Sequence, residues 1–150
     1  MKLTTCTGKQ GFTLIELMVV LLILGLLIGI VGPKVIGQGD QARVDSARIQ
    51  IKSIESALKM YRLDNAAYPS TEQGLDALIN MPQTGDIPKK WRKGGYMDSI
   101  PKDPWGYDYV YMHPGVHGDF DLFSRGADGA TGGDDFNADI TNWEQEEKQG

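Results

Sequence analysis

Cysteine and histidine are scarce in this 150-residue chain, and basic residues do not outnumber acidic ones. The only cysteine, Cys6, precedes a long hydrophobic run, so the remainder of the chain forms no internal disulfide. Two histidines are too few for a complete zinc site, and a formal net charge of −5 argues against a nucleic-acid-binding surface. Because the sequence also has no nucleophile–base pair and no phosphate-binding glycine loop, we expect a structural protein rather than an enzyme.

The most prominent feature that is present is the hydrophobic run from Phe12 to Gly32. As an α-helix rising about 1.5 Å per residue, it is long enough to cross the roughly 30 Å hydrocarbon core of a bilayer. Residues 1–11 contain two lysines and no acid, so the positive-inside rule predicts that they stay in the cytoplasm. We predict one membrane span, which by itself is also compatible with an uncleaved signal anchor.

Glu16 is the only charged residue in this run. A carboxylate in hydrocarbon costs roughly 2 to 3 kcal/mol unless it is paired. The sequence therefore predicts that Glu16 has a cationic partner.

The residues around Glu16 identify a candidate partner. The segment K-Q-G-F-T-L-I-E-L closely resembles the processing motif of type IV pilins and type II secretion pseudopilins. This resemblance implies that a prepilin peptidase cuts between Gly11 and Phe12 and then N-methylates Phe12. The new amine would lie one helical turn from Glu16, on the same face of the helix. The two groups can pair within one subunit or between stacked subunits, and the resemblance favours the second arrangement.

A second helical pattern follows Pro33. Proline removes one backbone hydrogen bond, so Pro33 is expected to bend or loosen the helix, although it is also compatible with the end of a membrane helix. Apolar residues then recur at alternating spacings of three and four from Val44 to Tyr61. This periodicity predicts an amphipathic helix that ends near Asn65 and packs on a sheet of the same domain.

Shorter elements are predicted downstream. Ser70 and Gln73 fit a capping box at the start of a short helix that extends to Asn80. The segment Asp103 to Gly106 has a turn signature, and strands are predicted at residues 107–112, 119–124 and 140–143. The expected fold class is α+β: a long N-terminal helix, half transmembrane and half amphipathic, packed on a small antiparallel β-sheet. The segment from Tyr68 to Leu78 resembles that of pseudopilins, which implies a pilin-like fold.

The stretch between the last two predicted strands, residues 125–139, is here called the acidic loop. It contains four aspartates and four glycines, and hard oxygen ligands on a flexible loop suit Ca²⁺. The spacing does not match an EF-hand. On composition alone, a disordered acidic loop remains an equal alternative.

The stretch from Phe120 to Trp143, with its G-A-D-G, G-G and A-D-I-T-N-W landmarks, is similar to the calcium-binding loop of type II secretion major pseudopilins. Position by position, the resemblance implies Asp128 and Asp135 as side-chain ligands, with Asp134 as a further candidate. It also implies carbonyl ligands near Leu122, Arg125 and Ala130. Phe136 stands where some relatives carry a polar residue that could supply a ligand.

On these motifs the chain is identified as a member of the major pseudopilin family. The implied organisation is a leader at 1–11, a hydrophobic transmembrane and assembly helix at 12–32 and a periplasmic pilin-like domain at 33–150. The implied function is a subunit that leaves the inner membrane, forms a homo-oligomeric helical filament in the periplasm and drives folded exoproteins through an outer-membrane secretin. The implied partners are the prepilin peptidase, minor pseudopilins, an inner-membrane platform protein and an assembly ATPase.

Two alternatives remain at this point. The first is a type IV pilin for adhesion or motility, many of which carry a C-terminal disulfide loop that a chain cut after Gly11 cannot form. The second is a single-span periplasmic calcium-binding module that never polymerises. His113 and His117 could bind a metal, but with no third ligand nearby they are more typical of surface residues.

Overall fold

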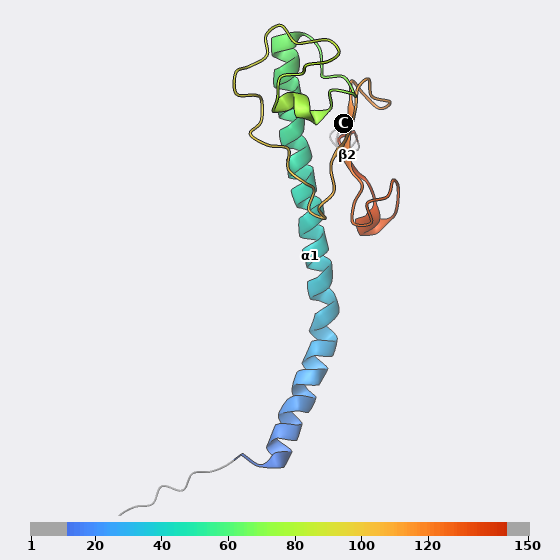
Figure 1. The fold of residues 1–150 in the computed structure, drawn as a ribbon. Coiled ribbons are helices and arrows are strands. Elements are labelled where there is room, and N and C mark those ends of the chain that lie inside the picture. Colours follow the sequence, from blue (N-terminus) through green and yellow to red (C-terminus); the bar gives the residue numbers. More distant parts are fainter. Residues whose placement is uncertain (1–11, 144–150) are drawn as a thin grey trace, which may run out of the picture. The chain divides into compact units, whose positions relative to one another are not determined.

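The computed structural model describes residues 12–143, without the side chains of residues 28–38. The predicted leader, including Gly11, and the last seven positions, 144–150, lie outside the described residues. The chain divides into two compact units between Gly39 and Asp40. Its elements are α1 (Leu14–Asn65), the 3-10 helix η1 (Leu75–Leu78), β1 (Val110–Met112), β2 (Asp121–Ser124), the 3-10 helix η2 (Asp135–Asn137) and β3 (Ile140–Thr141) (Figure 1).

Helix α1 begins with a side-chain cap. The backbone N–H of Glu16 donates to Thr13 Oγ1 over 3.3 Å, which satisfies one of the free N–H groups of the first turn. Thr13 and Glu16 also have the spacing of a capping box, and the helix dipole favours an acid in this first turn. Glu16 therefore favours the start of the helix even without a cation beside it.

The apolar side chains of the first part of α1 are exposed. Phe12 is 82% exposed, and the large apolar residues from Leu14 to Leu27 are 47% to 77% exposed. Within the described residues, no helix combines the length and apolar character that crossing a membrane requires. The predicted hydrophobic run continues to residue 32. The structure does not describe the side chains of residues 28–32 or of Pro33, but the backbone of α1 runs through these positions.

The second part of α1 packs into the core through the predicted stripe of apolar residues. Val44, Ala47, Ile51, Ile54, Leu58 and Tyr61 are all buried, at 8% exposure or less. The helix ends at Asn65, as predicted, because Ala66 adopts a left-handed conformation (φ 64°) and its N–H closes the last turn on the carbonyl of Arg62 at 2.7 Å. The amide Nδ2 of Asn65 donates to the carbonyl of Tyr61, satisfying another group of the last turn.

The predicted capping box at Ser70 is confirmed, but the helix after it is shorter than predicted. The N–H of Gln73 donates to Ser70 Oγ at 3.2 Å, and the N–H of Ser70 donates to Gln73 Oε1 at 3.0 Å. Gly74 then takes φ 60°, which no continuous right-handed helix accommodates. Only the four residues of η1 remain helical after this break.

Three antiparallel strands form one sheet in the order β1-β2-β3, with Val110 opposite Phe123 and Ser124 opposite Ile140. Strand β1 begins later than predicted, because Tyr107 closes the preceding turn instead of joining the sheet: its N–H donates to Asp103 Oδ1 and its carbonyl accepts from the N–H of Asp103. The other two strands are also shorter than predicted. The buried core joins α1 and η1 to the sheet through Leu75, Leu78, Tyr109, Tyr111, Phe120, Leu122 and Ile140.

Candidate functional site

The acidic loop connects β2 to β3 and is drawn in red-orange in Figure 1. Its two ends are held together because Ser124 and Ile140 pair in the sheet. Inside the loop, the N–H of Ala127 donates to the carbonyl of Phe136 at 3.0 Å. Gly126 has φ 66°, and a Cβ there would lie 2.7 Å from the carbonyl oxygen of Ala138, so only glycine fits. The base of the loop is thus narrow and well defined.

Two aspartates of the loop accept hydrogen bonds from backbone N–H groups of the same loop. Asp128 Oδ1 accepts from the N–H of Ala130 at 2.9 Å, and Asp139 Oδ2 accepts from the N–H of Gly132 at 3.0 Å. The other oxygen of Asp139, Oδ1, is buried and has no hydrogen-bond donor among the described residues. A buried carboxylate oxygen without a donor is costly, and a cation would compensate it.

The remaining predicted ligands lie in varied positions. Asp134 and Asp135 are exposed, at the start of η2, and Asp135 has φ 52°. The carbonyl of Leu122 accepts from the N–H of Asn142 at 3.0 Å, so one of its lone pairs is already used by the sheet. In the described part of the chain, no N–H group donates to the carbonyls of Arg125 and Ala130, which leaves both able to bind a cation.

These residues fit a hard cation in part. Among residues 12–143, apart from the side chains not described, no three His, Cys, Asp or Glu side chains are gathered as a metal-binding group. A cation here would therefore need backbone carbonyls in addition to carboxylates, as Ca²⁺ accepts. Our sequence-based ligand set omitted Asp139, although Asp139 belongs to the A-D-I-T-N-W landmark; only its burial reveals the unpaired oxygen.

A second polar cluster surrounds Asp121, which is 1% exposed in β2. Its carboxylate accepts from the N–H groups of Val116 and His117, at 3.0 and 3.1 Å, and lies 3.0 Å from His117 Nδ1. The His117 ring stacks on Trp143 with centroids 4.0 Å apart. His113 Nδ1 instead contacts the carbonyl of Asp119 at 2.8 Å. The two histidines thus make separate contacts.

We predict that Asp121 makes folding sensitive to acid. Burial raises the pKa of the Asp121 carboxyl, but the N–H donors of Val116 and His117 and the His117 ring together lower it further, so the pKa lies below its ordinary value. A lowered pKa contributes stability above the unfolded-state value of about 3.9, and this contribution is lost as the pH falls toward the folded-state value. Asp121→Asn should therefore lower the melting temperature at pH 7 more than at pH 3.

Thermal melts of the full-length chain in detergent, followed by circular dichroism at both pH values, measure this difference. Asp108→Asn is the control, because Asp108 is exposed and pairs only with Lys102 at the surface. A deficit for Asp121→Asn that is equal at pH 7 and pH 3 would contradict the prediction.

Glu16 and Phe12, the predicted assembly residues, are both exposed in the single chain. Within the described part of this chain, no Lys, Arg or His side chain forms an ion pair with Glu16. The bond between Gly11 and Phe12 lies partly outside the described residues. The partner that the sequence predicts for Glu16 is therefore not found among the described residues, and the pairing stays a prediction.

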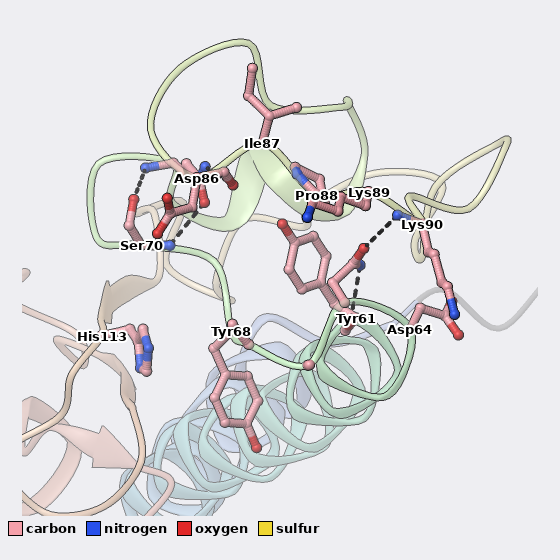
Figure 2. Close-up of a pocket in the computed structure, with 14 residues that line it drawn as sticks. Tyr61, Asp64, Tyr68, Ser70, Asp86, Ile87, Pro88, Lys89, Lys90 and His113 are labelled. Atoms are coloured by element: carbon pink, nitrogen blue, oxygen red, sulfur yellow. Dashed lines mark hydrogen bonds between the residues drawn. The ribbon is translucent and has the colours of Figure 1, made fainter.

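A cavity of about 610 Å³ lies beside the C-terminal end of α1 (Figure 2). Part of its polar lining is engaged in hydrogen bonds: Asn65 accepts from the N–H of Lys90 at 3.2 Å, and Gln73 Nε2 donates to the carbonyls of Thr84 and Asp86. Trp91, in the same loop, donates from Nε1 to the carbonyl of Ala77. The first of these bonds fastens the loop at residues 81–96 to the end of α1, and the others fasten it to Gln73 and to Ala77 of η1.

Two family models match the chain. The model described as Type II secretion system (T2SS), protein G covers residues 34–143, and the model described as Prokaryotic N-terminal methylation motif covers residues 6–32. Type II secretion system core protein G of Pseudomonas aeruginosa is 54% identical over 136 residues, which are 91% of this chain and 96% of that protein. The protein of the same description from Vibrio cholerae is 49% identical over 135 residues, 90% and 92% of the two chains.

A solved structure is also similar. The crystal structure of the major pseudopilin from the type 2 secretion system of enterohaemorrhagic Escherichia coli superimposes with a TM-score of 0.67 at 42% sequence identity. The match covers 73% of this chain and 89% of that chain. It confirms the predicted fold class, a long helix packed on a small antiparallel sheet.

Proposed function

This chain belongs to the type II secretion system protein G family, and from that membership we propose that it is a major pseudopilin, a structural subunit of the secretion pseudopilus. In this role it polymerises into a helical filament that helps to drive folded exoproteins across the outer membrane. The family match favours this role over that of an adhesion or motility pilin. The proposed role is structural and requires no catalytic residues.

The observation that carries the proposal is the continuous exposure of apolar side chains from Phe12 to Leu27 around Glu16, which has no ion-pair partner among the described residues. An apolar surface of this extent is normally covered by lipid or by another protein. Lipid would cover it before assembly, and the same segments of neighbouring subunits would cover it in the filament. In both surroundings Glu16 gains from a cation, and the amine of a processed Phe12 is the one that the N-terminal methylation motif supplies.

The proposed location follows from the two surroundings of the apolar segment, first lipid and then the filament. The chain is inserted once in the bacterial inner membrane, with the leader in the cytoplasm and the C-terminal unit in the periplasm. Assembly then transfers it into a periplasmic filament. The partners proposed for these steps are the prepilin peptidase, minor pseudopilins, the platform protein, the assembly ATPase and the secretin.

We also propose that the acidic loop binds Ca²⁺. The support is the buried Oδ1 of Asp139, which has no hydrogen-bond donor among the described residues, together with the Asp128 carboxylate and the carbonyls of Arg125 and Ala130, to which no described N–H group donates. Asp134 and Asp135, which are exposed, are further carboxylates within the same loop. The bound ion would balance the negative charge of these oxygens, and the fold of the loop would set their spacing.

Mass spectrometry and a secretion assay together test the proposed function. The chain, expressed with its prepilin peptidase, should be recovered with N-methylated Phe12 as its first residue, whereas Gly11→Leu should remain uncut because the small residue before the bond is lost. Deleting the gene should abolish exoprotein secretion, and the wild-type gene should restore it. A wild-type chain that still begins at Met1, or a deletion strain that secretes normally, would overturn the proposal.

A further inference from the structure

We propose that Asp103 is a positioning residue for the cation site, and that it holds the acidic loop on both sides of Asp128. This inference rests on the proposed calcium binding. Asp103 lies outside the loop, in the turn that precedes β1, and is only 4% exposed. Each of its two carboxylate oxygens begins a separate chain of contacts that ends in the loop.

The first chain of contacts runs through Ser124. The Ser124 hydroxyl donates to Asp103 Oδ2 at 2.6 Å and accepts from the N–H of Gly126 at 3.2 Å. Ser124 is 0% exposed, so water does not compete for either bond. Because the hydroxyl has a single hydrogen and donates it to Asp103, its lone pairs face Gly126. Asp103 thereby fixes the backbone two residues before Asp128.

The second chain of contacts runs through Tyr107. Asp103 Oδ1 accepts from the N–H of Tyr107 at 2.7 Å and from that of Trp105 at 3.1 Å. The Tyr107 ring then lies directly against Gly129: a Cβ added to Gly129 would be 2.7 Å from Cζ of the ring. Asp103 thereby fixes the backbone immediately after Asp128.

Support on both sides matters because the exposed Asp128 side chain accepts, among the described residues, only from the N–H of Ala130. A ligand on a glycine-rich loop loses conformational freedom when it binds a cation, and an already fixed backbone reduces that cost. Removing groups that orient metal ligands commonly weakens metal affinity by about 10- to 100-fold. We expect loss of either chain of contacts to have an effect in this range.

The test uses calorimetric titration of the full-length chain in detergent with calcium chloride. Ser124→Ala and Tyr107→Ala should each raise Kd about 10-fold or more, and Asp103→Ala should raise it further because it removes both carboxylate oxygens and with them both chains of contacts. Tyr107→Phe should bind like wild type, since it keeps the ring that rests on Gly129. Tyr107 is 42% exposed, so its variants are expected to fold even if Asp103→Ala does not.

Tyr111→Phe is the matched control for stability. It removes the bond from the buried Tyr111 hydroxyl to the carbonyl of Pro69, 2.8 Å long and outside the acidic loop. It should lower the melting temperature and leave Kd unchanged. If Ser124→Ala and Tyr107→Ala also melt lower while binding calcium like wild type, Asp103 supports the fold alone and the inference is wrong. If wild type itself binds no calcium, the proposed calcium function fails, and this inference fails with it.

Discussion

Removing calcium with a chelator should lower the melting temperature of the full-length chain by about 10 to 20 °C. A ligand present at 100 times its Kd stabilises the folded state by about 2.7 kcal/mol, and for a unit of this size each kcal/mol shifts the melting temperature by roughly 4 to 8 °C. The shift should be seen in thermal melts in detergent, with and without calcium. Equal melting temperatures under the two conditions would remove calcium from the proposed function.

Asp139→Asn should affect the melting temperatures of the calcium-free and calcium-bound protein differently. Without calcium it should melt at the same temperature as wild type or higher, because a neutral amide replaces a carboxylate whose Oδ1 is buried without a donor. The rise in melting temperature that calcium gives the wild type should be largely lost in this variant. Asp128→Ala should also lose the calcium-dependent gain, and Asp86→Ala, at an exposed position outside the loop, should keep it. A full calcium response in Asp139→Asn would show that this carboxylate is not a ligand.

Glu16→Gln should be processed and inserted normally but should lose nearly all filament assembly. Removing one partner of a buried ion pair costs about 3 to 5 kcal/mol, which corresponds to more than a 100-fold loss in the affinity of each subunit contact. Glutamine can still serve in the capping box with Thr13, so this variant removes the charge and keeps the helix start. Filament yield by electron microscopy and N-terminal mass spectrometry measure the two outcomes.

Glu16→Asp provides the matched control, since it keeps the charge on a shorter side chain. It should assemble at an intermediate level between wild type and Glu16→Gln. Normal filaments from Glu16→Gln would exclude an ion pair at Glu16 from the assembly mechanism.

Features that depend on local periodicity were predicted well. The stripe from Val44 to Tyr61, the helix end at Asn65 and the Ser70–Gln73 capping box follow from spacings within one or two helical turns, and the structure confirms each of them. The short helix was predicted too long because the left-handed conformation of Gly74 is not evident from its neighbours. The first strand was predicted too early because Tyr107 closes the turn.

The candidate site was predictable only in outline. Composition located the acidic loop, and family resemblance selected Asp128 and Asp135 within it, with Asp134 as a further candidate, a choice that still awaits a test. The unpaired oxygen of Asp139 and the bond between Asp103 and Ser124 depend on burial and on contacts across 21 positions of the chain. Such long-range contacts leave no periodic signal in one sequence, so Asp103 could not be connected to the loop before the fold was known.

The pairing of Ser124 with Ile140 has a consequence for how this chain can vary. Because the sheet already brings the two ends of the acidic loop together, the length of chain between them has little influence on the sheet. Doubling the length of a flexible loop adds only about 0.6 kcal/mol of closure entropy. We therefore expect the fold to tolerate insertions, deletions or an epitope tag at the tip around Thr131 and Gly132. Such changes should alter the affinity for the metal but not the architecture.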